Sequence, residues 1–388
     1  MFATANRFKE LPVHLFAEVD RMKREAIAQG KDVIDLGVGD PDTPTPKPII
    51  DACLKALNNP VNHRYPYQMG SMNYRNAIVR FFKKRYGVTL DAVKNIIPLI
   101  GSKEGIAHFP LVFVNPGDVV IAPDPGYPAY ITGTVLAGGQ YYPLPLLKKN
   151  NYLMDLESIP SDIVAKAKLF FFNYPNNPTT GSADLKYFSK IAAFCHEHKI
   201  IGAHDAAYQE LYFESPPPSF LQAPGAMETG VEFHSLSKTF SMTGWRVGFA
   251  TGEDSLIAGL TRIKTNIDTG LFLAIQEAAA FALDHLEELT QPAVAVYKRR
   301  RDIVVDGLRQ AGFKAEVPDA TIYVWTEVPN GMASMEFAKK LLESTGVVIT
   351  PGAGLGKASE GFFRISLTTS EERLKEAIQR MRDFSNTL

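Results

Sequence analysis

Apolar residues recur along the chain at two spacings, and each spacing predicts one kind of secondary structure. In segments 47–59 and 72–87 they fall three and four residues apart, which is the spacing of an amphipathic helix. Between such segments stand short, continuous apolar runs that end in Pro, Gly, Asn or Asp, as strands buried on both faces do. These runs occupy residues 118–123, 168–175, 199–205 and 231–236.

The alternation of helical segments and buried strands continues from residue 47 to residue 285 and then stops. Such an alternation favours a mostly parallel sheet covered by helices on both faces. After Gln291 the chain changes to a long polar helix, strand-like runs and two further helices, at 293–312, 320–328, 334–344, 346–350, 361–367 and from 371 onward. We therefore expect an α/β protein with a large domain at 47–285 and a smaller α+β domain made of 1–46 and 286–388.

Composition and charge exclude several classes of protein. With 388 residues, the chain has the length of two or three domains, or of one large domain with a smaller one. The net charge of −1 gives no electrostatic basis for binding nucleic acid or an anionic membrane, and no run approaches the ~18 apolar residues of a membrane span. Charges near the start argue against a signal peptide, and two distant cysteines, Cys53 and Cys195, fit a reducing compartment. We expect a cytoplasmic protein.

In open sheets of this kind, ligands bind beyond the carboxyl ends of the strands, so polar residues that directly follow apolar runs are the candidates. Gly101, Ser102 and Lys103 lie between an apolar run and a predicted helix, where small residues and free backbone N–H groups suit an anion such as phosphate. A helix simply capped by Ser102 explains the same residues. Tyr127 follows the next run, and its ring has the shape to stack on a flat cofactor.

The next two strand ends carry an amide and a carboxylate. Asn177 follows a very apolar run within an Asn- and Pro-rich turn, and turn chemistry alone accounts for it. Asp205 ends a buried run, with Tyr208 three residues later. A carboxylate in that place is costly unless it faces a cation or a hydrogen-bond donor, and a structural salt bridge is one way to satisfy it.

Lys238 stands just before a further apolar strand, with Ser235 and Ser237 before it and Arg246 eight residues after it. A lysine there is either a surface residue or an amine placed to be desolvated and to react. Together the strand ends offer a phosphate site, a stacking ring, a carboxylate, an amine and an arginine. Pyridoxal phosphate requires that set, because its aldehyde needs an amine, its ring nitrogen a carboxylate and its phosphate a dianion site.

Nearly the whole chain resembles the fold-type I, class I aminotransferases, which use pyridoxal phosphate (PLP). The motifs that carry the resemblance stand in the family's order, and they are GDPDTPTP, IGSKEGIAH, PDPGYPAY, NYPNNPT, HDAAY, HSLSKTFSMTGWRVG and FFRISL. Within the family the chain is most similar to the bacterial LL-diaminopimelate aminotransferases, through ELPVHLF, HRYPYQMG, TNIDTG and VVITPGAGLG. The resemblance implies a fold-type I PLP-dependent transferase that moves an amino group between LL-2,6-diaminopimelate (tetrahydrodipicolinate) and 2-oxoglutarate in lysine biosynthesis, with ping-pong kinetics.

Other activities share the residues named so far. An alanine or aspartate aminotransferase would use the same scaffold, and a PLP-dependent lyase or decarboxylase would use the same cofactor. A non-catalytic, ligand-sensing relative would carry an added DNA-binding domain, and the sequence has no basic extension of that size. A dinucleotide-dependent dehydrogenase is disfavoured, because no glycine fingerprint follows an early strand.

The resemblance implies a role for each residue around the cofactor. Lys238 would bind the aldehyde covalently, and Asp205 would pair with the protonated ring nitrogen. Tyr208 and Asn177 would hydrogen-bond the phenolic oxygen of the ring, and Tyr127 would stack on the ring itself. The residues implied for the phosphate are Ser102, the backbone of Lys103, Ser235, Ser237 and Arg246.

The resemblance implies two further groups of residues, for the substrate and for a partner subunit. Arg364 would clamp the substrate α-carboxylate, helped by Asn177 and the backbone of Gly39, since the planar fork of an arginine binds a carboxylate bidentately. Tyr65 and Thr269 would reach across the interface of a homodimer into the neighbouring site.

Two departures from the family pattern bear on these roles. The asparagine motif has one residue more before its glycine, at Thr179-Thr180, so we expect the turn after Asn177 to differ. His14 stands among the implied substrate-binding residues where the family commonly has tyrosine, which leaves recognition of the distal end of the substrate open. Separately, the glycine-rich segment 352–361 matches neither nucleotide-binding fingerprint, so we assign it no ligand.

Overall fold

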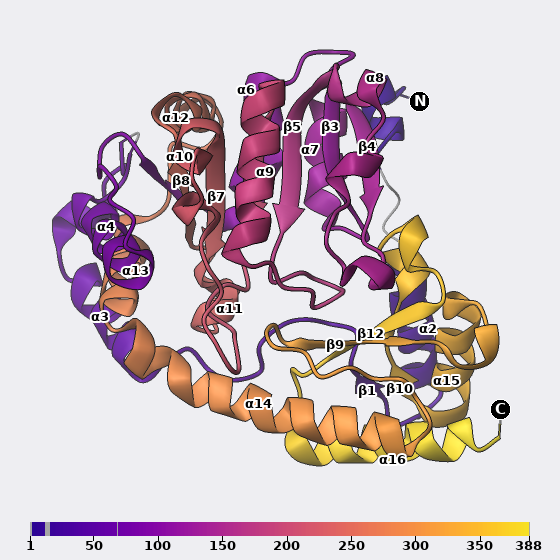
Figure 1. The fold of residues 1–388 in the computed structure, drawn as a ribbon. Coiled ribbons are helices and arrows are strands. Elements are labelled where there is room, and N and C mark those ends of the chain that lie inside the picture. Colours follow the sequence, from indigo (N-terminus) through magenta and orange to yellow (C-terminus); the bar gives the residue numbers. More distant parts are fainter. Residues whose placement is uncertain (1, 12–15, 68, 388) are drawn as a thin grey trace.

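The computed structural model describes residues 2–11, 16–67 and 69–387, which form two units joined by the long helix α14 (Leu286–Gln310) (Figure 1). The strands of the larger unit are β2 (Ile96–Leu99), β3 (Val119–Asp124), β4 (Gln140–Pro145), β5 (Ala167–Asn173), β6 (Ile201–Asp205), β7 (Gly230–Ser235) and β8 (Gly248–Gly252). Its helices are α3 (Lys47–Leu57), α4 (Met72–Tyr86), α5 (Ser102–His108), α6 (Pro110–Phe113), α7 (Pro128–Leu136), α8 (Ser161–Val164), α9 (Leu185–His198), α10 (Ala226–Thr229), α11 (Leu236–Thr239), α12 (Asp254–Ile267) and α13 (Leu273–Asp284).

The strands of the larger unit form a single sheet in the order β2-β8-β7-β6-β5-β3-β4. The strands from β7 to β4 run parallel to one another, whereas β8 is antiparallel to both β7 and β2. A parallel crossover needs a long connection, usually with a full helix, and the segment between β7 and β8 holds only the short helix α11. The expected mostly parallel sheet is confirmed, with this reversed strand as its exception.

Helices cover both faces of the sheet, as expected from the continuous apolar strands (Figure 1). On β5, Phe170 and Phe172 point into a core shared with α4, α9 and α13, while Leu169 and Phe171 point into a core shared with α5, α7 and α12. All four side chains are fully buried. Burial of each contributes about 1.5–3 kcal/mol, so the central strands are held firmly and their carboxyl ends are fixed in space.

Local sequence explains where the predicted helices begin and end. Helix α4 begins after Ser71, whose hydroxyl accepts a hydrogen bond from the backbone N–H of Tyr74 at 3.4 Å. It ends at Gly87, which takes a φ of 71° that favours glycine. The helix expected at 293–312 begins earlier, at Leu286, and Pro292 lies inside it, where the proline removes one backbone N–H from the helical hydrogen bonds.

The smaller unit gathers residues from both ends of the chain. β1 (Ile34–Asp35) pairs in parallel with β10 (Val347–Val348), and an antiparallel sheet has the order β11 (Thr350–Pro351), β12 (Phe362–Ser366), β9 (Tyr323–Glu327). Around them lie α2 (Phe16–Ala28), α15 (Ser334–Thr345) and α16 (Glu371–Ser385). Helix α1 (Asn6–Lys9) instead contacts α7 of the larger unit. The domain boundaries at residues 47 and 285 stay a prediction.

Short 3-10 turns lie at Pro60–His63, Lys148–Asn150, Leu156–Ser158, Phe220–Gln222, Pro329–Gly331, Gly352–Gly354 and Lys357–Ser359. Among the residues that the structure describes, no helix has both the length and the apolar character needed to cross a membrane.

Candidate active site

A cavity of about 330 Å³ opens at the carboxyl ends of β5, β6 and β7, between the two units. Its lining residues are Gly39, Ser102, Lys103, Gly126, Tyr127, Pro128, Asn173, Asn177, Asp205, Ala207, Tyr208, Ser235, Ser237, Lys238, Thr243, Arg246, Tyr323, Leu355 and Arg364. Every site residue expected from the sequence is in that set except Tyr65, Thr269 and His14. His14 lies outside the described residues.

Lys238 lies on the one-turn helix α11, directly after β7. Ser235 begins that turn, and its hydroxyl accepts a hydrogen bond from the backbone N–H of Ser237 at 3.2 Å. The Lys238 ammonium donates to the carbonyl oxygen of Gly39 at 2.5 Å. The pKa of Lys238 is lowered to about 8, mainly by burial; the charge of Asp40 opposes this shift, and the charges of Arg364 and Arg246 add to it. The amine is therefore much easier to deprotonate than one in water.

Asp205 ends β6 at the floor of the cavity. Its Oδ2 accepts a hydrogen bond from the Tyr130 hydroxyl at 2.8 Å, and its Oδ1 accepts one from the backbone N–H of Ala207 at 3.2 Å. Within the described residues Asp205 forms no ion pair, so the structural salt bridge that would have explained it is not found. Burial raises the pKa of Asp205, against the Tyr130 hydrogen bond. The site thus holds a buried carboxylate that lacks a cation.

The end of the cavity where the sequence predicts a phosphate site is formed by two turns that pack closely together. A Cβ atom on Gly101 would lie 2.4 Å from Nη2 of Arg246, and Gly101 also has a φ of 74°, so only glycine fits. Ser237 has a buried hydroxyl with no hydrogen-bond partner among the described residues. Helix α5 is capped by Gly101 and begins at Ser102 without a side-chain cap, so the alternative in which Ser102 caps the helix is wrong.

Arg364, on β12, faces the cavity from the smaller unit. Its Nη1 donates to Oδ1 of Asn177 at 2.7 Å, and its Nη2 donates to the carbonyl oxygen of Gly37 at 2.7 Å. Its guanidinium carbon lies 4.1 Å from the ring centroid of Tyr323. Arg364 is 5% exposed, so its charge is held in a dry pocket by amide, carbonyl and aromatic groups.

Tyr323 and Tyr130 are site residues that the sequence reasoning missed. The Tyr323 hydroxyl lies 3.1 Å from that of Tyr208, which also accepts a hydrogen bond from Nδ2 of Asn177 at 3.3 Å. A Cβ on Gly39 would lie 1.9 Å from the Tyr323 hydroxyl, so a side chain at position 39 would collide with Tyr323 as it is placed. Tyr323 stands in an apolar strand, and its spacing predicts only which face it occupies.

The glycine-rich segment 352–361 packs against the larger unit. The carbonyl oxygen of Leu355 accepts from the backbone N–H of Gly126 at 3.2 Å, and Oδ2 of Asp124 accepts from the backbone N–H of Ala358 at 3.3 Å. A Cβ on Gly356 would lie 1.7 Å from Oδ1 of Asp124. The glycines therefore allow close packing at the rim of the cavity, where Leu355 lines it.

The turn after Asn177 does contain the additional residue expected from its sequence. The backbone N–H of Asn176 donates to the carbonyl oxygen of Gly181 at 2.8 Å, which closes the turn, and Thr180 takes a φ of 62°. Asn177 still lines the cavity. Tyr65 and Thr269 lie away from it, and Tyr65 is 71% exposed.

Comparison with known proteins gives a consistent result. The family model described as aminotransferase class I and II matches residues 31–381. The LL-diaminopimelate aminotransferase of Aquifex aeolicus is 50% identical over 385 residues, covering 99% of this chain and 100% of the relative. The enzyme of the same name from Moorella thermoacetica is 50% identical over 379 residues, or 97% of each chain.

Solved structures agree with the fold. Substrate-bound BacF from Bacillus subtilis has a TM-score of 0.95 at 37% identity, and the match covers 99% of this chain and 98% of that one. A Thermus thermophilus aspartate aminotransferase double mutant has a TM-score of 0.93 at 27% identity, with 100% of both chains covered.

Proposed function

The chain belongs to the class I and II aminotransferase family, and from that premise we propose that it is an LL-diaminopimelate aminotransferase that uses pyridoxal phosphate. The reaction moves an amino group between LL-2,6-diaminopimelate and 2-oxoglutarate. One observation carries the proposal. Relatives of that name match nearly the full chain at 50% identity, and the matched chain folds around a cavity with an amine, a carboxylate and an arginine clamp.

The cavity fits pyridoxal phosphate. Among the described residues the buried Ser237 hydroxyl has no hydrogen-bond partner and the Arg246 guanidinium packs against Gly101, and both groups suit a phosphate. The Asp205 carboxylate forms no ion pair with any described residue, so it suits a protonated ring nitrogen. The residues that would hold the phosphate are Ser102, the Lys103 backbone, Ser235, Ser237 and Arg246. Tyr127 would lie against the ring. When bound, the cofactor supplies an aldehyde for the amine and a ring that accepts the electron pair released at the substrate Cα.

Lys238 and Asp205, which both line the cavity, would support that chemistry. With a pKa of about 8, Lys238 is uncharged in an appreciable fraction of molecules near neutral pH, so it serves as a nucleophile and then carries the proton removed from Cα. Asp205 would favour a protonated ring nitrogen by offering a buried negative charge. Tyr208 and Asn177 provide hydrogen bonds for the phenolic oxygen.

Arg364 would bind the α-carboxylate of the substrate. Its fork already points at the amide of Asn177, and the Gly39 segment lies alongside it in the lining of the cavity. A carboxylate that enters here meets two N–H groups in one plane, which fixes the orientation of Cα above Lys238. His14, which lies outside the described residues, stays a predicted substrate-binding residue.

A homodimer would complete the site. Val61, Tyr65, Tyr67, Ile267 and Phe272 are large apolar residues that are 39% to 74% exposed, and they come from two segments that pack together. Exposed apolar groups gathered in this way are typical of an interaction surface. If a second copy covers this surface, Tyr65 and Thr269 of the first copy would lie near the cofactor of the second. We also propose a cytoplasmic location, since both cysteines are free thiols.

The test uses purified protein incubated with pyridoxal phosphate. The protein should become yellow, and borohydride should fix the cofactor covalently to Lys238, as peptide mass spectrometry would show. Single-turnover reactions with LL-diaminopimelate, alanine and aspartate then separate the substrates. A fast reaction with diaminopimelate supports the proposal, whereas reaction with only alanine or only aspartate would indicate an alanine or an aspartate aminotransferase. Release of ammonia or carbon dioxide without an oxo acid acceptor would indicate a lyase or decarboxylase.

A further inference from the structure

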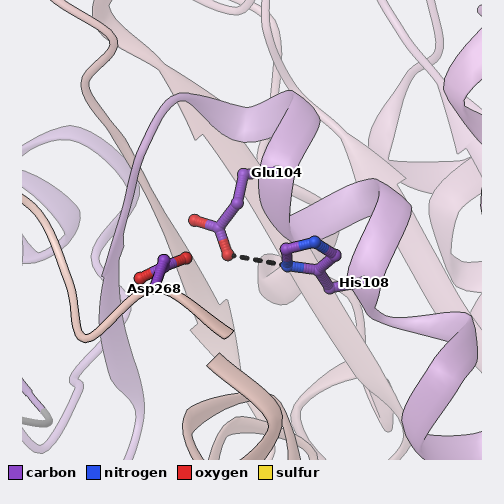
Figure 2. Close-up of side chains that lie close together, drawn as sticks. All are labelled: Glu104, His108 and Asp268. Atoms are coloured by element: carbon purple, nitrogen blue, oxygen red, sulfur yellow. Dashed lines mark hydrogen bonds and ion pairs between the residues drawn. The ribbon is translucent and has the colours of Figure 1, made fainter. Parts of the chain in front are cut away.

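Lys264, on α12, is a lysine whose ammonium group is buried outside the candidate site. Its side chain is 1% exposed, and its Nζ lies 2.8 Å from Oε2 of Glu104 and 2.8 and 2.9 Å from the two carboxylate oxygens of Asp268. Figure 2 shows that Glu104, His108 and Asp268 converge on one point, as the ligands of a metal ion do. The Lys264 ammonium contacts both carboxylates and so supplies the positive charge that such a cluster needs.

On one side, Glu104 connects the Lys264 ammonium to the phosphate end of the cavity. Its Oε2 accepts a hydrogen bond from the backbone N–H of Ile100 at 2.9 Å, and its Oε1 lies 3.1 Å from Nδ1 of His108. Glu104 therefore bridges the Gly101 turn and holds the start of α5, where Ser102 lines the cavity. Burial alone would raise the pKa of Glu104, but His108 and Lys264 outweigh it and keep the carboxylate ionised.

On the other side, Asp268 holds the loop that points away from the cavity. Its Oδ1 accepts a hydrogen bond from the backbone N–H of Gly270 at 2.7 Å. This hydrogen bond closes a turn around Thr269, which has a φ of 66°. A Cβ on Gly270 would lie 2.9 Å from Cγ of Pro66, so this loop packs tightly against the residue next to Tyr65. The same contacts thus support both residues that we expect to reach into a partner subunit.

We propose that Lys264 is a positioning residue that couples the phosphate end of its own cavity to the loop that completes the site of the neighbouring subunit. The proposal rests on the proposed function and on the homodimer. The relay runs from Ile100 through Glu104, Lys264 and Asp268 to Gly270. A coenzyme phosphate that orders the Gly101 turn in one subunit would then also favour the ordered loop that its neighbour needs.

The first experiment compares Lys264→Met with the unaltered protein and with Lys340→Met, which removes an exposed lysine paired with Glu336. Each protein is stripped of coenzyme and titrated with pyridoxal phosphate by absorbance, well below its unfolding temperature. We expect the dissociation constant of Lys264→Met to rise on the order of tenfold, within the usual range of coupling between sites, and that of the control to stay constant. A merely structural lysine would lower the unfolding temperature and leave the dissociation constant unchanged.

A second measurement separates positioning from loss of folding. Lys264→Ala lacks three methylene groups and the ammonium, so ethylguanidinium, a cation that does not condense with the coenzyme aldehyde, should enter the gap and restore coenzyme affinity, whereas 1-propanol should not. Zinc should also restore it through Glu104, His108 and Asp268. If neither cation restores affinity in a variant that unfolds cooperatively, a positioning role for the charge is refuted.

Hybrid dimers test the coupling between subunits. One subunit carries Lys238→Ala together with Lys264→Met, and its partner is unaltered. The only active site is then that of the unaltered subunit, which keeps its own Glu104 contacts but receives the loop of the altered subunit. We expect this site to need a severalfold higher coenzyme concentration than the same hybrid without Lys264→Met. Equal requirements would refute the coupling. If even the unaltered protein binds no coenzyme, the proposed function fails instead, and the two failures are distinct.

Discussion

Replacing Tyr323 with phenylalanine removes one hydroxyl from the candidate site and leaves the aromatic ring in place. That hydroxyl lies 3.1 Å from the hydroxyl of Tyr208, which also receives a hydrogen bond from Asn177. A phenol has one donor hydrogen and two acceptor positions. If Asn177 and Tyr323 fill the two acceptor positions, the single hydrogen of Tyr208 is left for the cofactor oxygen.

The size of the effect follows from these contacts. A neutral hydrogen bond has a net value of about 0.5–1.5 kcal/mol, so its loss should slow the chemical step by a factor of about 2–12. Substrate binding should change little, because the Arg364 guanidinium still lies over the ring, 4.1 Å from its centroid. Tyr323→Leu removes the ring as well. The lost cation–π contact of about 0.5–2 kcal/mol should then raise KM by a further factor of about 2–30.

The assay is the single-turnover reaction with LL-diaminopimelate, followed by coenzyme absorbance over a range of substrate concentrations. Tyr187→Phe is the matched control, because it removes a buried hydroxyl that donates to the carbonyl oxygen of Met154 at 2.6 Å, remote from the cavity. We expect Tyr323→Phe to lower the limiting rate and Tyr323→Leu to raise KM in addition. A Tyr323→Phe variant with an unchanged rate and a raised KM would refute the assignment of the acceptor positions.

Three other changes test separate parts of the molecule. Gly101→Ala places a Cβ 2.4 Å from Nη2 of Arg246 at a φ of 74°, so coenzyme affinity should fall at least about tenfold in an absorbance titration; unchanged affinity would remove Gly101 from the phosphate site. Glu232→Gln breaks a fully buried pair with His204, whose Nδ1 lies 2.6 Å from Oε1, and should cost about 3–5 kcal/mol of unfolding free energy in urea, against less than about 1 kcal/mol if the pair is unimportant. Lys238 has a pKa lowered from 10.5 to about 8, so between pH 8 and pH 10.5 the unfolded chain binds more protons than the folded protein. The free energy of unfolding without coenzyme should therefore rise with pH in that range. Lys238→Met should lack that rise, and equal slopes would contradict the lowered pKa.

Much of the site could be predicted from the sequence because it follows local rules. Asp205 and Lys238 each stand directly after an apolar run, and a parallel sheet brings the carboxyl ends of such runs to one edge. The residues that reasoning missed depend on partners far away in the chain. Tyr130 contacts a residue 75 positions away and Tyr323 one 115 positions away. No local spacing encodes such contacts, since they depend on how helices and units pack.

The reversed direction of β8 illustrates the same limit. Its apolar run predicts a buried strand equally well in either direction, because side chains alternate between faces in both. The direction fits the connection after β7, which holds only the one-turn helix α11 and lacks the full helix that a parallel crossover usually has. A consequence for the site is that β8 enters the sheet at Gly248, beside Ser235 and the start of α5, so that Arg246 lies next to Gly101.

Lys238 and Lys264 show what distinguishes a reactive lysine from a structural one in this protein. Both are withdrawn from water, and each stands on a helix. Lys264 meets two carboxylates, which compensate its charge, whereas Lys238 meets one backbone carbonyl and, within the described residues, forms no ion pair. Burial without a carboxylate favours the neutral amine. The charge of Asp40 opposes the lowering of the pKa of Lys238, so Asp40→Asn should lower that pKa further and speed coenzyme capture at neutral pH, and an unchanged rate would show that the pKa is not what limits this amine.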